Sequence, residues 1–84
     1  MVKEDKMFQA CYLKFSQNDT IKKLLINTKN KILVEASPFD KIWGIGLKWD
    51  NDLVLNENNW KGLNLLGKTL MKVRLSLSQN NTEF

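Results

Sequence analysis

The stretch LNLLGKTLMKVRLSL, residues 63–77, carries the clearest helical pattern in the chain. Its apolar side chains recur every three or four residues, at Leu66, Leu70, Val73 and Leu77. This spacing places them on one face of an α-helix, which turns once in about 3.6 residues. We therefore predict a helix over residues 63–77 and expect the polar tail SQNNTEF, 78–84, to be frayed.

Two segments nearer the N-terminus show the same periodicity. In residues 3–16, apolar and aromatic side chains share one side of a predicted helix, at Met7, Phe8, Cys11, Tyr12 and Phe15. A second helix is expected to begin after an N-cap at Asn18 or Asp19 and to run through Asn27, because short polar side chains cap helix N-termini. Its inward-facing residues are expected to be Ile21, Leu24 and Leu25.

The pattern changes between the second and third helices. The run KILVEA, 31–36, is short and apolar with β-branched residues, which predicts a buried strand. Residues 36–62 follow no regular period and hold the only Pro and three of the four Gly. Long irregular segments in compact domains are commonly functional. The predicted fold class is therefore α+β and predominantly helical, with three helices, one short strand and a long functional loop.

The composition limits the chemistry that the chain can perform. Its 84 residues suffice for one small domain with a thin margin of stability. With one cysteine, Cys11, and no histidine, the chain can form neither a Cys/His zinc site nor a histidine-based nucleophile system. Carboxylates show no spacing typical of a metal site with oxygen ligands. We predict no metal and no cofactor.

Charge and hydropathy indicate a soluble, cytoplasmic protein without membrane association. No apolar run approaches the roughly 20 residues of a membrane span, and the N-terminus lacks a signal-peptide pattern. The net charge is +4, and 12 of the 13 basic residues are Lys. Because base-reading proteins favour Arg, this composition argues against sequence-specific binding of nucleic acid. We interpret the charge as a mildly basic solvated surface; attraction of a phosphorylated or nucleotide-like small molecule is the alternative.

The irregular segment places a carboxylate, an indole and two glycines close together. Asp40 and Trp43 are three residues apart, so both fall on the same side of a tight turn. An indole can stack on a base, worth about 1–3 kcal/mol. A nearby carboxylate can orient water or stabilise the oxocarbenium-like state of glycoside cleavage. The run Gly44-Ile45-Gly46 allows close approach of the backbone to a ligand, and its N–H groups can bind phosphate.

Each of these residues also has a structural interpretation. Trp43 can belong to the core, Asp40 can cap a helix and Glu35 can cap a turn. The Gly-Ile-Gly run lacks the longer phosphate-binding fingerprint. The chain's three tryptophans also require more covering surface than so short a chain provides, which indicates an incomplete domain.

Four motifs, in this order, resemble the NADAR superfamily of YbiA-like N-glycosidases. They are KFSQN (14–18), LLINT (24–28), LVEASPFDKIWGIGL (33–47) and WKGLNLLGKTLMKVR (60–74). The resemblance implies a mostly helical α+β fold and an activity that cleaves N-glycosidic bonds. The implied substrates are phosphoribosylamino-pyrimidine intermediates of riboflavin synthesis or ADP-ribosyl-modified guanine bases.

The resemblance also implies roles for individual residues. Asp40 and Trp43 match the family's D-x-x-W-G motif and are implied to be catalytic. Glu35 matches the acid at the end of the predicted strand, and Asn64 matches the Asn of the family's G-x-N-x-L-G motif. We expect these two residues to bind ribose or to hold the loop. Together with Gly44, Ile45 and Gly46, they form the predicted substrate-binding set.

Family members are about twice as long as this chain, so the resemblance implies that residues 1–84 are the C-terminal portion of one NADAR domain. The N-terminal portion of the family carries a Ser-Glu-His-like segment whose Glu is a principal catalytic candidate, and this chain has no histidine. Three hypotheses follow. The chain is an N-glycosidase that requires a complementary N-terminal half or a homo-oligomer, a non-catalytic or regulatory module that binds nucleotide or ADP-ribose, or a truncated, inactive relic.

Overall fold

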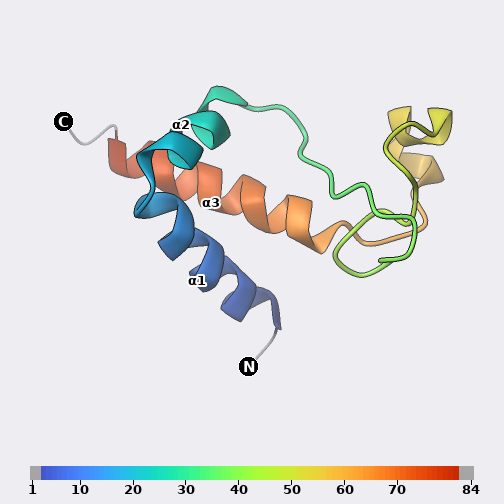
Figure 1. Ribbon diagram of the computed structural model, residues 1–84, viewed down its shortest axis with the longest axis horizontal. Helices are drawn as coiled ribbons and strands as arrows, with labels where there is room; N and C mark the ends of the chain where they lie inside the picture. Colours follow the sequence, from blue (N-terminus) through green and yellow to red (C-terminus); the bar gives the residue numbers. More distant parts are fainter. Residues whose placement is uncertain (1–2, 82–84) are drawn as a thin grey trace. The chain divides into compact units, whose positions relative to one another are not determined.

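The computed structural model describes residues 3–81 and contains three α-helices in that range (Figure 1). They are α1 (Lys3–Ser16), α2 (Asp19–Asn27) and α3 (Leu65–Asn81), and two short 3-10 helices, η1 (Asp52–Leu55) and η2 (Glu57–Asn59), lie between α2 and α3. The three predicted helices are thus confirmed. None of the helices within the described residues is long and apolar enough to cross a membrane.

The chain forms two compact units. The first, which we call the helical unit, comprises the described residues 3–32 and 69–81. The second, the loop unit, comprises residues 33–68 and includes the first turn of α3. All the residues that the sequence analysis assigned to a functional site lie in the loop unit.

The helical unit has a small apolar core. Leu25 of α2 and Val73 and Leu77 of α3 are buried. Leu24 was expected to face inward, but its side chain is 64% exposed, because α2 has only nine residues and buries a narrow face that includes Leu25. Asn18 is the N-cap of α2, as predicted: its side-chain oxygen accepts hydrogen bonds from the N–H groups of Thr20 and Ile21 at 3.1 and 3.4 Å.

Helix α1 contributes half-buried side chains along its predicted apolar line. The rings of Phe8 and Tyr12 stack with their centroids 6.0 Å apart. Cys11 is half-buried beside them, and this burial raises the pKa of its thiol, with Lys14 acting in the opposite direction. A thiol with a raised pKa stays protonated and weakly nucleophilic at neutral pH. Cys11 is therefore not suited to nucleophilic catalysis.

Arg74 of α3 stabilises the end of α2 within the helical unit. Its side chain is buried, and Nη1 donates hydrogen bonds to Thr28 Oγ1 at 2.8 Å and to the carbonyl of Lys31 at 2.9 Å. Thr28 is the C-cap of α2, and Lys29 follows with a φ of 56°. A cation at this place complements the partial negative charge of the helix C-terminus.

The bounds of α3 differ from the prediction at both ends. The helix begins at Leu65 rather than at residue 63, because Asn64 has a φ of 53° and lies outside the helical region. It continues to Asn81, so the prediction of a frayed tail is wrong for residues 78–81. No Gly or Pro follows Leu77 to stop the helix. The rest of the predicted tail, 82–84, lies outside the described residues.

The predicted strand is wrong, and with it the α+β class: residues 3–81 contain no β-strand. A strand requires a neighbouring strand for its backbone hydrogen bonds, and the segment 31–36 has none. The side chain of Asn64 takes that place. Its Oδ1 accepts a hydrogen bond from the N–H of Glu35 at 2.9 Å, and its Nδ2 donates to the carbonyl of Leu33 at 2.9 Å. The described fold is helical, with one long irregular segment.

Candidate active site

Asp40 organises a tight turn at the centre of the candidate site. Its Oδ1 accepts hydrogen bonds from the backbone N–H groups of Trp43 at 2.8 Å and Ile42 at 3.0 Å. Its own N–H donates to Ser37 Oγ at 3.3 Å. This is the pattern by which an Asp side chain stabilises a turn. Asp40 therefore caps a turn rather than a helix, and the turn fixes the position of Trp43 relative to its carboxylate.

Asp40 keeps one oxygen outside this turn. Among the described residues, none donates a hydrogen bond to Oδ2. The side chain is half-buried, as is that of Trp43. In such a half-buried carboxylate, the hydrogen bonds to Oδ1 fix the orientation of the group. Oδ2 can then accept a hydrogen bond from a ligand, or face a positive charge on it, without a change in that orientation.

The turn is attached to the N-terminus of α3. Leu63 N–H donates to the carbonyl of Lys41 at 2.8 Å, Leu65 N–H to that of Ile42 at 3.1 Å, and Leu66 N–H to that of Trp43 at 3.0 Å. The first N–H groups of a helix have no partner inside the helix, and the carbonyls of the turn supply one. The start of α3 thus positions the backbone that carries Asp40 and Trp43.

Asn64 holds the two sides of the loop unit together. It is 1% exposed; its N–H donates to the carbonyl of Gly44 at 2.9 Å, and its carbonyl accepts from Lys68 N–H at 3.0 Å. Since its side-chain amide is bonded to Leu33 and Glu35, both ends of that amide are used inside the protein. Of the two roles expected for Asn64, the geometry matches that of holding the loop.

The Gly-Ile-Gly run packs against the chain on both sides. A Cβ on Gly44 would lie 2.8 Å from the carbonyl oxygens of both Glu35 and Asp40, so only glycine fits there. Gly46 has a φ of 71°, which also favours glycine. Ile45 is fully buried, its N–H donates to the carbonyl of Glu35 at 3.0 Å and its carbonyl accepts from Lys61 N–H at 2.8 Å. The N–H of Ile45 is therefore occupied by the carbonyl of Glu35, and Gly44 and Gly46 on either side of it are buried.

The structure therefore brings the predicted residues into one cluster. The backbones of Glu35 and Asp40 meet at Gly44, and Trp43 precedes this glycine. Glu35 is half-buried, and within the described part of the chain its carboxylate accepts no hydrogen bond. Ile45 and Asn64 are buried, and so are Gly44 and Gly46, which leaves the half-buried Glu35, Asp40 and Trp43 as the predicted residues with accessible surface.

A pocket of about 420 Å³ in the loop unit was not anticipated from the sequence. It is lined by residues between η2 and the first turn of α3, namely Glu57, Asn58, Trp60, Gly62, Leu63 and Lys68. The sequence analysis considered Trp60 only as one of three tryptophans that need covering surface. The available signal was an indole, a carboxylate, an amide and a lysine within twelve residues.

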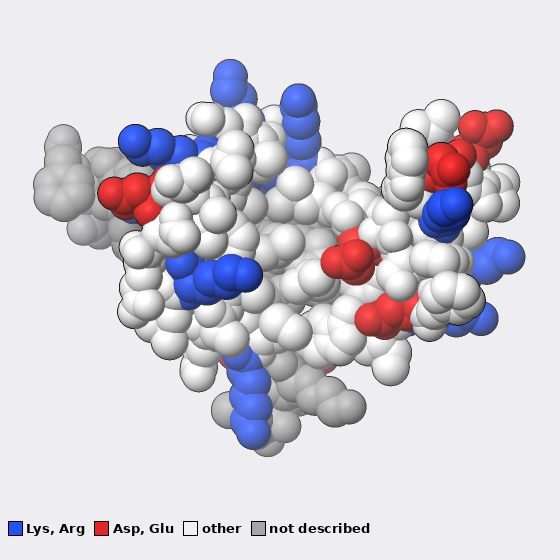
Figure 2. Space-filling model, viewed as in Figure 1, with Lys and Arg blue, Asp and Glu red and all other residues white. Residues whose placement is uncertain are grey.

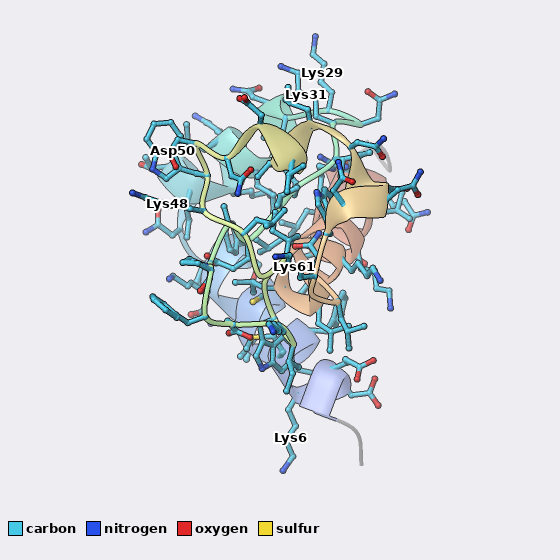
Figure 3. The ribbon with its side chains drawn as sticks, turned by 90° about the vertical axis from the view of Figure 1, so that its right-hand side faces the viewer. Lys6, Lys29, Lys31, Lys48, Asp50 and Lys61 are labelled. Carbon is cyan, nitrogen blue, oxygen red and sulfur yellow. The ribbon has the colours of Figure 1, made fainter. Side chains whose placement is uncertain are left out.

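Charged side chains outside the candidate site are spread over the surface of the described residues on the face shown in Figure 2. On the face shown in Figure 2, basic side chains mostly stand apart rather than in one continuous patch, which agrees with a mildly basic solvated surface. Lys48 and Asp50 lie together at the edge of the loop unit (Figure 3), with Lys48 Nζ 4.0 Å from Asp50 Oδ2. Both side chains are exposed, so this ion pair contributes little to stability.

The comparisons with known proteins identify the family. The NADAR domain family matches residues 1–78, and the chain belongs to this family. It is 54% identical over 72 residues to N-glycosidase R617 of Acanthamoeba polyphaga mimivirus, covering 86% of this chain and 42% of that protein. It is 40% identical over 74 residues to N-glycosidase Npun_R5314 of Nostoc punctiforme, covering 88% of this chain and 40% of that protein.

A third relative carries a different name. The chain is 38% identical over 73 residues to the chloroplastic riboflavin biosynthesis protein PYRR of Arabidopsis thaliana, covering 87% of this chain and 10% of that protein. The chain therefore spans less than half the length of these relatives. No solved structure matches the chain significantly.

Proposed function

We propose that the loop unit forms part of the active site of an N-glycosidase, with Asp40 as a catalytic carboxylate. One observation carries this proposal: Asp40 Oδ1 is anchored by two backbone N–H groups, while Oδ2 accepts no hydrogen bond from any described residue. A charge that is oriented before the substrate binds needs no reorganisation during the reaction. The relatives named N-glycosidases support the reaction class.

The reaction is hydrolysis of the bond between ribose C1′ and a base nitrogen. That bond breaks with its electron pair moving to the nitrogen, and positive charge develops at C1′. Asp40 stabilises this charge or orients the attacking water, whose oxygen bonds to C1′; one proton of the water ends on the departing base. Trp43 stacks on the base. Water and positioned polar groups suffice for this chemistry, so we propose no metal and no cofactor.

The other site residues divide between binding and support. Glu35, with its half-buried carboxylate, accepts hydrogen bonds from ribose hydroxyls, and the buried glycines Gly44 and Gly46 keep the backbone around it closely packed. Ile45 and Asn64 hold the loop beneath them. We propose a small-molecule substrate of the phosphoribosylamino-pyrimidine or ADP-ribosyl type. The relative named for riboflavin biosynthesis supports the first type.

We further propose that residues 1–84 are the C-terminal portion of a NADAR domain and that activity requires the complementary N-terminal portion. In the loop unit, Phe39, Trp49 and Leu55 are 95%, 75% and 91% exposed. We propose that the complementary portion covers these three side chains. The relatives also extend well beyond the region that they share with this chain. A cytoplasmic location stays a prediction of the sequence.

The test is hydrolysis of phosphoribosylamino-pyrimidine and ADP-ribosyl-guanosine by the chain alone and after addition of the N-terminal part of N-glycosidase R617. We expect release of free base only in the mixture. Activity of the chain alone would contradict the need for a complementary portion. In that case, light scattering would show whether the active chain is a homo-oligomer. Absence of hydrolysis by folded protein in both preparations would contradict the enzyme proposal and favour a binding module or an inactive relic.

A further inference from the structure

The pocket beside η2 is directly connected to the turn that carries Asp40 and Trp43. Leu63, in the pocket wall, donates its N–H to the carbonyl of Lys41 at 2.8 Å. Gly62, also in the wall, packs so closely that a Cβ would collide with the carbonyl of Gly44 and lie 2.8 Å from Lys41 Cα. The turn therefore packs against backbone that forms part of the pocket wall.

The pocket has the size of a nucleotide subsite. Its volume of about 420 Å³ falls within the range of about 300–1,000 Å³ that is typical of small-molecule sites. A single phosphate would leave most of that volume empty, whereas a nucleoside monophosphate would fill much more of it. The size therefore favours a ligand with a ring system over a single phosphate.

The indole of Trp60 is held in a fixed orientation at this pocket. Its Nε1–H donates a hydrogen bond to the carbonyl of Val54 at 3.0 Å, and its backbone N–H donates to the carbonyl of Glu57 at 3.0 Å. The side chain is half-buried, so part of it remains accessible. A fixed and accessible indole is a platform on which a nucleobase can stack.

Polar groups of complementary types surround the indole. Lys68, in the first turn of α3, supplies an exposed ammonium group suited to a phosphate. Glu57 and Asn58 in η2 supply a carboxylate that can accept hydrogen bonds from sugar hydroxyls and an amide that can bond to a base edge. One stacking surface, one cation, one carboxylate and one amide match the parts of a nucleotide.

We propose that this pocket binds a nucleoside monophosphate group, with the base stacked on Trp60, the phosphate at Lys68 and the ribose hydroxyls at Glu57. The role of the pocket rests on the proposed function: it holds the non-reacting end of the substrate while the N-glycosidic bond is cleaved at the adjacent turn. A substrate with a nucleotide at each end, of the ADP-ribosyl type, would use both sites. A phosphoribosyl substrate would use only the turn.

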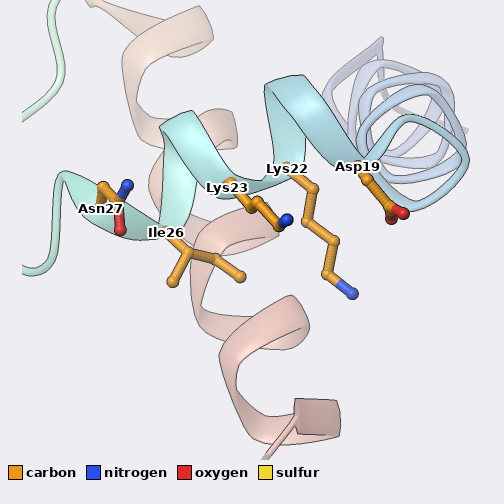
Figure 4. Close-up of a pocket in the computed structure, with 5 residues that line it drawn as sticks. All are labelled: Asp19, Lys22, Lys23, Ile26 and Asn27. Carbon is orange, nitrogen blue, oxygen red and sulfur yellow. The ribbon is translucent and has the colours of Figure 1, made fainter.

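Another hollow in the described structure has a less suitable lining. Its volume is about 280 Å³, and its walls come from α2 alone, with Asp19, Lys22, Lys23, Ile26 and Asn27 (Figure 4). No aromatic ring lines it. Its lysines are therefore not combined with a surface on which a base could stack.

The test is calorimetric titration of the folded chain with adenosine 5′-monophosphate, adenosine and inorganic phosphate. We expect the monophosphate to bind at least about tenfold more tightly than either fragment, because it uses both the indole and the ammonium. Lys68→Gln is expected to weaken monophosphate binding by about tenfold and to leave adenosine binding unchanged. Lys72→Gln is the matched control, since Lys72 is an exposed lysine one turn further along α3 that does not line the pocket.

Trp60→Phe separates stacking from charge. This substitution is expected to weaken the binding of both adenosine and the monophosphate. Lys68→Gln should still weaken monophosphate binding when it is added to the Trp60→Phe variant. Thermal melting checks that the variant is folded. No binding of the monophosphate to folded wild-type protein, or equal effects of Lys68→Gln and Lys72→Gln, would overturn the proposal. The titration involves no turnover, so the two proposals can fail separately. Binding of the monophosphate by this chain, with no hydrolysis by the mixture with the N-terminal part of R617, would refute the proposed enzyme and keep the pocket. Hydrolysis by that mixture without binding of the monophosphate would refute the pocket and keep the enzyme.

Discussion

At the scale of single residues, Asn64 joins three parts of the loop unit. Four of its groups are bonded inside the protein: its backbone N–H and carbonyl and both ends of its side-chain amide. They join the segment around Leu33 and Glu35, the glycine run at Gly44 and the first turn of α3. Such a side chain cannot be exchanged for another of similar size without leaving a buried group unpaired.

We therefore predict that Asn64→Asp destabilises the protein by about 2–4 kcal/mol. The shape is retained, but the donor to the Leu33 carbonyl is lost and a negative charge is placed against that oxygen. Urea denaturation followed by circular dichroism measures the change. Asn59→Asp, at an exposed position in η2, is the control and should shift stability by less than about 0.5 kcal/mol. Equal effects of the two substitutions would refute this role of Asn64.

At the scale of elements, Gly67 shows how the loop unit constrains α3. Ala is normally about 1 kcal/mol better than Gly inside a helix. At this position, however, a Cβ would lie 2.6 Å from Asn64 Oδ1 and closer still to the Leu33 carbonyl oxygen. The close approach of the helix to Asn64 therefore requires glycine.

Gly67→Ala is accordingly predicted to destabilise the protein by about 1–3 kcal/mol through overpacking, which reverses the usual sign. Thermal melting measures this loss of stability. The reference is Lys72→Ala, an exposed change to the same residue in the same helix, which should be nearly neutral. A Gly67→Ala variant that melts at a higher temperature than wild type would show that the helix does not need this approach.

The elements also show which parts of the fold follow from local sequence. The helices were predictable because periodic apolar residues and the cap at Asn18 act within a few residues of one another. The segment 31–36 was predicted wrongly because its outcome depends on Asn64, 29 residues beyond Glu35, whose amide replaces a partner strand. The start of α3 was misplaced for a related reason, since the positive φ of Asn64 is required by those distant contacts.

The site could be predicted only in part. The spacing of Asp40 and Trp43 placed both in one turn, as the structure shows. The pocket around Trp60 depends on bonds from Trp60 to Val54 and from Leu63 to Lys41, and the second of these spans 22 residues. No periodic pattern marks such contacts.

At the scale of the whole molecule, the chain belongs to the NADAR family but covers less than half of the relatives' lengths. The loop unit carries a carboxylate–indole turn and an adjoining pocket. It also carries exposed apolar side chains at Phe39, Trp49 and Leu55. These features together support a site that is shared with a further portion of a NADAR domain.

The most direct test of this account is the rate of base release by the mixture of this chain with the N-terminal part of R617, compared between wild type and Asp40→Asn. Asn retains Oδ1 and hence the bonds to Ile42 and Trp43, so the turn persists while the charge is lost. The account predicts that kcat falls by at least about 100-fold and KM changes by less than about threefold. A kcat within about threefold of wild type, or a loss confined to KM, would contradict a catalytic role for Asp40.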